Sequence, residues 1–310
     1  MSKQWLVKSV ALLTFAGAAT LPLSAQAVRG GALPGTVNYV EGQVSINGNP
    51  VNPRQTGAQV QLNQSLMTAN GRAEMLLSPG VFVRAGNNTE IRMVSPGLID
   101  PTIEVVHGQA MIEVDQKLND ARITVLERGA SASILKYGLY RFDSDSGRIA
   151  VFDGQINVTE NGMSKKLGKG REVMINGQPL KSVSFDVKAQ DQDPLYRWSS
   201  VRSGYLAEAN MSTAQYVYAG YNPYWTAGWA WNPYFSAWSW LPGDGFFYSP
   251  FGYPFFSPGY VVYAGRYGYG RGFGGAYVAR GFAARSAGVS MAARGGFGGG
   301  GFHGGGGGHR

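Results

Sequence analysis

The sequence predicts an all-β domain, either an antiparallel sandwich or roll or a β-solenoid-like fold, followed by a linker helix and a low-complexity tail. Three observations carry this prediction. Val, Ile and Phe alternate with polar residues in short runs through the middle of the chain, which is the period-two pattern of half-buried strands. Asn-Gly pairs, which tolerate the positive φ angles of tight hairpin turns, recur between these runs. Beyond residue 213 the composition changes to aromatic residues interrupted by Pro and Gly.

Residues 1–27 have the organisation of a secretory signal peptide. Lys3 and Lys8 lie ahead of a short apolar run, and Ala25-Gln26-Ala27 then offers the small residues that signal peptidase accepts. The apolar run is short for a bilayer span. We therefore expect export to the periplasm, the outer surface or the medium, with cleavage after Ala27. An uncleaved membrane anchor is the alternative.

The β-domain is expected over residues 35–188. Its predicted strands are short and are separated by turn signals such as Asn47-Gly48 and Asn161-Gly162. Closely spaced strands with turns between them favour hairpins over parallel units that cross through helices. The alternating runs are Thr36–Ile46, Ala73–Leu77, Val81–Arg84, Ile103–Val114, Leu139–Phe142, Ile149–Val158 and Glu172–Ile175.

A Gly-Gln pair between apolar residues occurs three times in this span. The three glycines are Gly42, Gly108 and Gly154. Glycine in such a place fits a bulge or a tight bend between two strand halves. The distances between the copies are unequal, so the pattern is not a strict repeat array. It indicates one hairpin type that is reused within a single β-domain.

An ordered series of short motifs over roughly residues 35–180 resembles the FecR family. The glycines at the family's motif positions would be structural, and they are Gly42, Gly80, Gly108, Gly138, Gly154 and Gly170. The motifs that carry the resemblance are Thr68–Glu74, Leu76–Val83, Glu104–Ala110, Tyr137–Phe142, Ala150–Val158 and Lys166–Val173.

The resemblance implies a periplasmic sensing or protein-binding module. Well-known family members carry a cytoplasmic segment that binds a sigma factor, followed by one membrane span. Here the β-domain follows directly after the predicted export signal. Pro79-Gly80 and Gly138-Leu139 also stand where the family usually has Asp-Gly and Gly-Thr. The resemblance therefore implies a type of module and does not imply control of a sigma factor.

Charge and composition restrict the classes of function. The chain contains no Cys, which excludes disulfides, thiolate metal sites and cysteine nucleophiles. Its net charge is +8, of which residues 1–27 contribute +2 and residues 216–310 contribute +5, which leaves +1 for residues 28–215. The basic excess thus belongs mainly to the tail, and it does not indicate that the β-domain binds nucleic acid.

The acidic segment Asp143-Ser144-Asp145-Ser146-Gly147 could supply ligands to a calcium ion, because alternate carboxylates can converge on one hard cation. Asp153 is the further candidate ligand. The segment lacks the third ligand that a calcium loop needs before its Gly, and it joins two predicted strands. We expect an acidic hairpin turn, and we assign no metal or cofactor.

Glu104, Glu113 and Asp115 could act as a general acid and base. In an alternating strand, however, such residues are expected to form the solvated face. His107 follows a predicted strand without a His or Cys partner nearby in the sequence, so a structural or surface role is expected. No catalytic constellation emerges, and the chain is predicted not to be an enzyme.

A linker helix is expected over residues 192–213, with Asp193 as its N-cap and Pro194 in its first turn. Packing on the β-domain is expected for this helix, and docking to a partner protein is the alternative. Its apolar residues lie mostly on one face, and they are Leu195, Trp198, Val201, Leu206 and Ala209.

Residues 214–264 form an aromatic and Pro-rich segment, and residues 265–310 form a Gly/Arg-rich tail that is expected to be disordered. Pro interrupts regular structure in the aromatic segment, so a separately packed domain is not expected. The segment could instead lie across its own β-domain, a partner protein or an envelope polymer.

These features predict a non-enzymatic exported module that binds a protein or an anionic cell-envelope polymer. The first alternative is a structural surface or matrix protein that acts through its tail, with self-association. A periplasmic role in sigma-factor signalling is the second. Nucleic acid is not the expected partner, because the chain is predicted to be exported.

Overall fold

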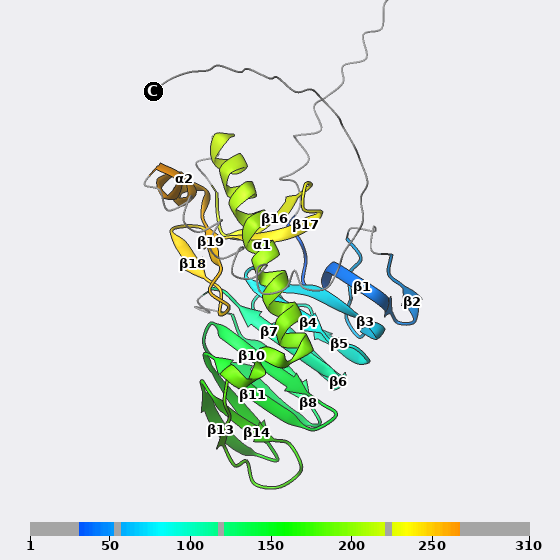
Figure 1. Cartoon of the computed structure of the whole chain (residues 1–310). Coiled ribbons are helices and arrows are strands. Elements are labelled where there is room, and N and C mark those ends of the chain that lie inside the picture. The colour runs from blue at the N-terminus through cyan, green and yellow to red at the C-terminus, as the bar shows by residue number, and fades with distance from the viewer. Residues whose placement is uncertain (1–30, 53–56, 117–120, 221–224, 267–310) are drawn as a thin grey trace, which may run out of the picture. The chain divides into compact units, whose positions relative to one another are not determined.

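The computed structural model describes residues 31–52, 57–116, 121–220 and 225–266. The predicted signal peptide and nearly all of the predicted Gly/Arg-rich tail lie outside these residues. In the described part of the chain, no helix combines the length and the apolar character needed to cross a membrane. Contacts divide the chain into one unit over residues 1–263 and another over residues 264–310. Figure 1 shows the strands and helices of the described residues and labels most of them.

The first unit begins with fifteen strands that belong to one sheet. Their bounds are β1 Thr36–Ile46, β2 Asn49–Pro50, β3 Ser65–Ser78, β4 Val81–Ala85, β5 Thr89–Ser95, β6 Thr102–His107, β7 Gln109–Val114, β8 Ile123–Glu127, β9 Ala130–Ile134, β10 Gly138–Asp143, β11 Arg148–Asp153, β12 Gln155–Glu160, β13 Met163–Gly168, β14 Arg171–Met174 and β15 Val183–Ser184.

The sheet folds over into two layers that share the long strand β3. The first half of β3 pairs with β5, and its second half pairs with β4. One layer continues from β4 through β7, β10, β11 and β14 to β15, and we call it the helix-side layer. The other layer continues from β5 through β6, β8, β9 and β12 to β13, and we call it the far layer. The described pairings are antiparallel except that of β6 with β8. The predicted all-β roll followed by a helix is thereby confirmed.

The chain crosses between the two layers at glycines of the predicted series. Gly108 joins β6 to β7, and Gly154 joins β11 to β12. Their φ angles are +75° and +89°. A Cβ on Gly108 would lie 2.4 Å from the carbonyl oxygen of Asn88, so backbone conformation and space both require glycine there. Gly42 lies at a register shift inside β1, opposite Gly71.

The remaining glycines of the series also lie at chain turns. Gly80 occupies the tight turn between β3 and β4, Gly138 begins β10, and Gly170 lies between β13 and β14. Each has a positive φ angle. Five of the six glycines therefore lie where the chain reverses direction or changes layer, and Gly42 lies at an irregularity within β1.

The main hydrophobic core lies between the two layers. Val83 and Ile112 contribute from the helix-side layer, and Ile103 and Val125 contribute from the far layer. Each of these four side chains is fully buried. The period-two pattern thus places one side of most strands of the roll in this core, as the sequence predicts.

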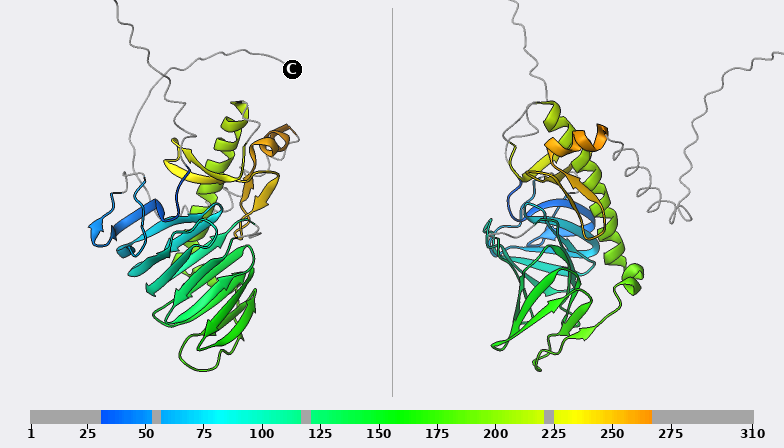
Figure 2. Two further views of the ribbon diagram at one scale, coloured as in Figure 1. Left: turned by 180° about the vertical axis from the view of Figure 1, so that it is seen from behind. Right: turned by 90° about the vertical axis from the view of Figure 1, so that its left-hand side faces the viewer.

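A long helix covers the outer face of the helix-side layer, and the right-hand view of Figure 2 shows it along one side of the strands. After a short 3₁₀ turn, η2 Lys188–Gln192, α1 spans Pro194–Ala219. The Asp193 side chain accepts a hydrogen bond from the Tyr196 N–H at 2.8 Å, as expected of an N-cap. The helix continues beyond its predicted end at residue 213. Val201 is 51% exposed, so it does not share the buried face.

The aromatic segment forms two hairpins and a short helix. These are β16 Gly228–Asn232 with β17 Ala237–Leu241, β18 Phe246–Tyr248 with β19 Pro254–Phe256, and α2 Pro258–Arg266. Pro233 lies in the first turn, Pro254 begins β19 and Pro258 begins α2, so these prolines mark element ends without interrupting strands.

The two hairpins pack on the protein's own roll and on α1, which is one of the alternatives that the sequence left open. Trp240 and Phe255 join Phe82 of β4 and Leu206 of α1 in a second hydrophobic cluster. The Phe82 and Trp229 rings meet edge to face at 5.2 Å between centroids. We call α1 with these hairpins the helix–aromatic layer.

Candidate functional site

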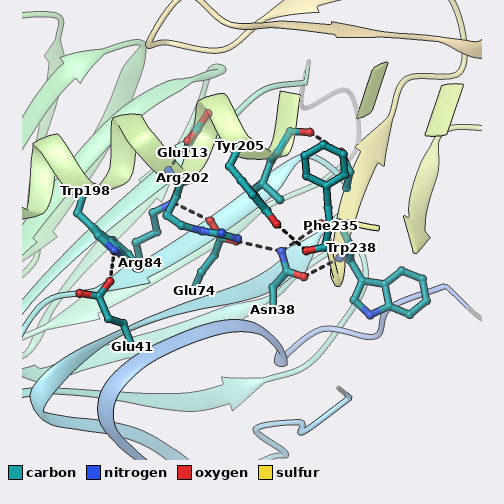
Figure 3. A network of polar contacts seen from close by, with 12 residues as sticks. Asn38, Glu41, Glu74, Arg84, Glu113, Trp198, Arg202, Tyr205, Phe235 and Trp238 are labelled. Atoms are coloured by element: carbon teal, nitrogen blue, oxygen red, sulfur yellow. Dashed lines mark hydrogen bonds and ion pairs between the residues drawn. The ribbon is translucent and has the colours of Figure 1, made fainter. Parts of the chain in front are cut away.

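A network of buried polar side chains joins the roll to the helix–aromatic layer (Figure 3). Glu74, Arg84 and Glu113 come from β3, β4 and β7, whose outer faces lie beneath α1. Arg202 and Ser203 come from α1. All five side chains are buried.

Arg84 occupies the centre of the network. Its Nε donates to Glu74 at 2.9 Å, and its Nη1 donates to Glu113. From the helix, Arg202 donates to Glu74 at 2.8 Å, and the Ser203 hydroxyl donates to Glu113 at 2.6 Å. Each glutamate is therefore shared between the sheet and α1.

The network extends to the aromatic hairpins through Asn38 of β1. Its amide donates to Glu74 at 2.9 Å and to the carbonyl oxygen of Trp238 at 3.1 Å. Its side-chain oxygen accepts a hydrogen bond from the Trp238 N–H at 2.8 Å. One amide side chain thus links the ionic network to β17.

Electrostatics holds Glu74 in its charged form. Burial alone would raise the pKa of this carboxyl group, but Arg202 and Arg84 outweigh burial and lower the pKa from 4.5 to about 2. Two guanidinium groups facing two carboxylates leave the network balanced in charge. A buried set of this kind, in which the arginines and glutamates form ion pairs with one another, has a structural role.

Asp115 lies at the edge of the network and behaves differently. Burial raises its pKa well above the ordinary value, and the neighbouring Glu113 adds to this rise. Asp115 is 1% exposed. Burial and the nearby negative charge of Glu113 both favour the protonated, neutral form of Asp115.

The expectation that Glu113 and Asp115 belong to a solvated face is wrong. Both are buried because α1 covers the outer face of the helix-side layer. The sequence around Pro79-Gly80 is nearly continuously apolar, which indicates that both faces of these strands are buried. Leu76 and Phe82 face outward there, beneath α1. Glu104 does lie near the surface, where it pairs with Arg92.

The carboxylates of the acidic turn accept hydrogen bonds from a side-chain and a backbone donor. Asp143 accepts from the side-chain amide of Gln109 at 2.9 Å, and Asp145 accepts from the Gly108 N–H at 2.8 Å. Asp153 lies at the other end of the β10–β11 hairpin, where it pairs with Lys169 at 3.3 Å. The structure does not bring Asp153 together with Asp143 and Asp145. Among the described residues, no group of three or more acidic or His side chains could hold a metal ion.

His107 ends β6 near the surface. Its Nδ1 lies 3.0 Å from the carbonyl oxygen of Asn88, and its Nε2 lies 3.8 Å from Glu90. These contacts are compatible with the expected structural or surface role.

Sequence reasoning did not single out Glu127, at the end of β8. It is fully buried, and neither of its carboxylate oxygens has a hydrogen-bond partner among the described residues. Burial, with a further contribution from Asp143, raises its pKa to about 8. Glu127 shares the period-two position of Ile123 and Val125, which both lie in the core, so the alternation is a signal that places its side chain inward.

A cluster of aromatic rings reaches the surface on the second hairpin and α2. Phe246 and Tyr260 stack with 5.0 Å between their centroids, and Tyr248 meets the edge of Phe246 at 5.4 Å. Phe246, Tyr248 and Tyr260 are 39%, 47% and 38% exposed, whereas Phe256 beneath them is buried. We call Phe246, Tyr248, Phe256 and Tyr260 the aromatic cluster.

Comparisons with known proteins give a sparse result. No protein-family model matches the sequence, and no curated protein matches it. Two crystal structures of a "putative anti-sigma factor" from Parabacteroides distasonis are similar to this chain with a TM-score of 0.35. One is 16% identical over 42% of this chain and 64% of its own, and the other is 15% identical over 43% and 63%. This chain therefore spans less than two thirds of either structure.

Proposed function

We propose that this chain is a non-enzymatic, exported binding module. The β-roll is the scaffold, and the helix–aromatic layer presents a surface to a partner protein or to an anionic polymer of the cell envelope. Export follows from the predicted signal peptide. The binding role agrees with the resemblance to the FecR family.

The observation that carries this proposal is the aromatic cluster. Three of its rings are partly exposed, yet Phe246 packs against the other two, and Phe246 and Tyr260 also pack against buried Phe256. Rigid aromatic side chains lose little conformational entropy on binding, and they are enriched at the centres of interfaces. A group of such rings on a surface is typical of a binding site.

The non-enzymatic part of the proposal rests on how the candidate acids are used. Glu74 and Glu113 hold arginine and serine side chains, and Asp143 and Asp145 hold the acidic turn together. Carboxylates engaged in this way stabilise the structure.

The test is a pull-down from envelope extract with the full mature chain and a variant that carries Phe246→Ser and Tyr260→Ser. We expect the variant to lose most of the captured material while keeping its circular dichroism spectrum. The matched control is Tyr234→Ser, because Tyr234 is 91% exposed in the turn of the first hairpin. Equal capture by the double variant and the control would refute the proposal.

The same assay addresses the alternative in which the tail is the active part. A chain that ends at Arg266 keeps the aromatic cluster, and we expect it to keep the captured partner. Complete loss of capture by this shorter chain would favour a surface or matrix protein that acts through residues 267–310.

A further inference from the structure

The two layers of the roll end in strands of different character. The strand order ends at β13 in the far layer and at β15 in the helix-side layer. β15 has only two residues, whereas β13 pairs with β12 in continuous register over six residues. Within the described residues, β12 is the only strand that pairs with β13. β13 therefore presents a regular extended edge whose outward backbone groups are free to accept another strand.

The surroundings of this edge are strongly basic. Residues 161–188 contain Lys165, Lys166, Lys169, Arg171, Lys181 and Lys188 but only Glu172 and Asp186 as acids. All six basic residues are exposed. This charge contrasts with the nearly neutral domain in which it lies. Of these six, Lys165 and Lys166 lie on β13 itself, and Lys169 and Arg171 follow in the turn after it and at the start of β14.

Two of these lysines lie on β13 itself and on opposite faces. Lys165 stands opposite Val158, whose side chain is in the core, and Lys166 stands opposite Asn157 on the outer side. Lysines on an edge strand usually oppose pairing with another strand. The same lysines favour pairing when the incoming strand carries acids on both faces, because cross-strand pairs of opposite charge are stabilising.

We propose that β13 is a docking edge for an extended acidic segment of a partner protein, which adds to the far layer as a further antiparallel or parallel strand. Backbone hydrogen bonds provide the pairing, and Lys165 and Lys166 select for Glu or Asp. A second copy of this chain is disfavoured as the occupant, because β13 paired with β13 brings lysines against lysines. This edge is separate from the aromatic cluster, so the proposal goes beyond the proposed function and fails independently of it.

The test uses the full chain and a short synthetic peptide in which two adjacent Glu residues are flanked by Val, so that an extended strand carries one acid on each face. Isothermal titration calorimetry measures its binding. Alternate amides of an extended peptide point to opposite edges. Two further peptides therefore carry N-methyl groups, one on the amides of the first edge and the other on those of the second edge. Strand addition requires one edge only, so we expect one methylated peptide to lose binding by roughly tenfold or more and the other to keep it.

Charge reversal tests the selection for acids. We expect the double variant Lys165→Glu, Lys166→Glu to weaken peptide binding roughly tenfold. The matched control is Lys181→Glu, Lys188→Glu, which changes the net charge equally but lies outside β13. We expect this control to have a much smaller effect, because screening by salt weakens charges beyond about 8 Å.

Three outcomes would overturn the proposal. The first is no binding of the parent peptide at about 1 mM, the weakest affinity at which such an edge would be useful. The second is equal binding by both methylated peptides and by polyglutamate, which would show attraction to a polyanion without strand pairing. The third is an equal loss of binding in the two double variants.

Discussion

The guanidinium group of Arg84 is fully buried, and it pairs with the carboxylates of both Glu74 and Glu113. Arg202 brings a second cation to Glu74 from α1. Removing one carboxylate leaves buried guanidinium groups with too little opposite charge, which costs far more than losing an exposed pair. The attachment of the helix to the roll is therefore decided by a few individual side chains.

Replacement of Glu74 by Gln tests this attachment. We expect Glu74→Gln to lower the free energy of unfolding by roughly 3–5 kcal/mol, because two arginines lose their shared carboxylate. Chemical denaturation measures the change. The control is Glu104→Gln, whose partly exposed pair with Arg92 should contribute less than about 1 kcal/mol. Similar losses in both variants would contradict a central role for Glu74.

The pKa of Glu74 also predicts a response to acid. Its folded-state value of about 2 lies below the ordinary 4.5, so its stabilising effect is complete above pH 4.5 and is lost as the pH falls through about 2. Glu74→Gln should remove this part of the acid denaturation curve. If the variant and the parent chain lost stability equally between these two pH values, the ionic pairing of Glu74 would be refuted.

Glu127 predicts the opposite dependence. Its folded-state pKa of about 8 exceeds the ordinary 4.5, so the folded protein binds more protons and loses stability as the pH rises from 4.5 to 8. We expect Glu127→Gln to reduce the slope of unfolding free energy near pH 6 by about 1.4 kcal/mol per pH unit. Denaturation at several pH values measures the slope, with Glu104→Gln as the control. An unchanged slope in Glu127→Gln would show that this carboxyl group is not held neutral by burial.

At the scale of elements, glycines set where strands change layer. Gly48 and Gly108 have similar φ angles of +80° and +75°, but only Gly108 lacks room for a Cβ. We expect Gly48→Ala to cost about 1 kcal/mol from backbone strain alone. Gly108→Ala should cost about 3 kcal/mol, because the new methyl group meets the Asn88 carbonyl. Thermal unfolding compares the two variants, and equal costs would refute the steric explanation.

The buried face of α1 provides a second test at this scale. Leu206 is fully buried beside Phe82 and Trp240. We expect Leu206→Ala to lower the free energy of unfolding by roughly 2–5 kcal/mol through the cavity that it leaves. Val201→Ala, on the exposed face, should change it by less than about 0.5 kcal/mol. A negligible effect of Leu206→Ala would show that the helix is only loosely attached.

At the scale of the whole molecule, the sequence predicts the β-roll better than the helix–aromatic layer that covers it. Period-two alternation is a local signal that locates most strands, and the Asn-Gly pairs at Asn47 and Asn161 are hairpin turns, but Asn70-Gly71 lies inside β3. The burial of Glu113 and Asp115 is not local, since it depends on a helix that begins at Pro194. The continuous apolar sequence around Leu76 and Phe82 is the main local indication of that cover.

The aromatic segment shows the same limit. Its prolines suggest irregular structure, yet they lie at the ends of hairpin strands and at the start of α2. The docking position of the hairpins is set by contacts such as Asn38 with Trp238, which are far apart in the sequence. Composition identifies the segment, and only tertiary packing places it on the roll.

The contacts between the helix–aromatic layer and the roll imply that the two form one cooperative unit. Native-state hydrogen exchange of the full chain measures this cooperativity most directly. We expect protected amides in α1 and in β16–β17 to open with the same free energy as those in β7 and β10. In Glu74→Gln, the opening free energies of all these elements should fall together. Opening of α1 and β16–β17 at a free energy several kcal/mol below that of β7 and β10 would show that the layer and the roll are separate units.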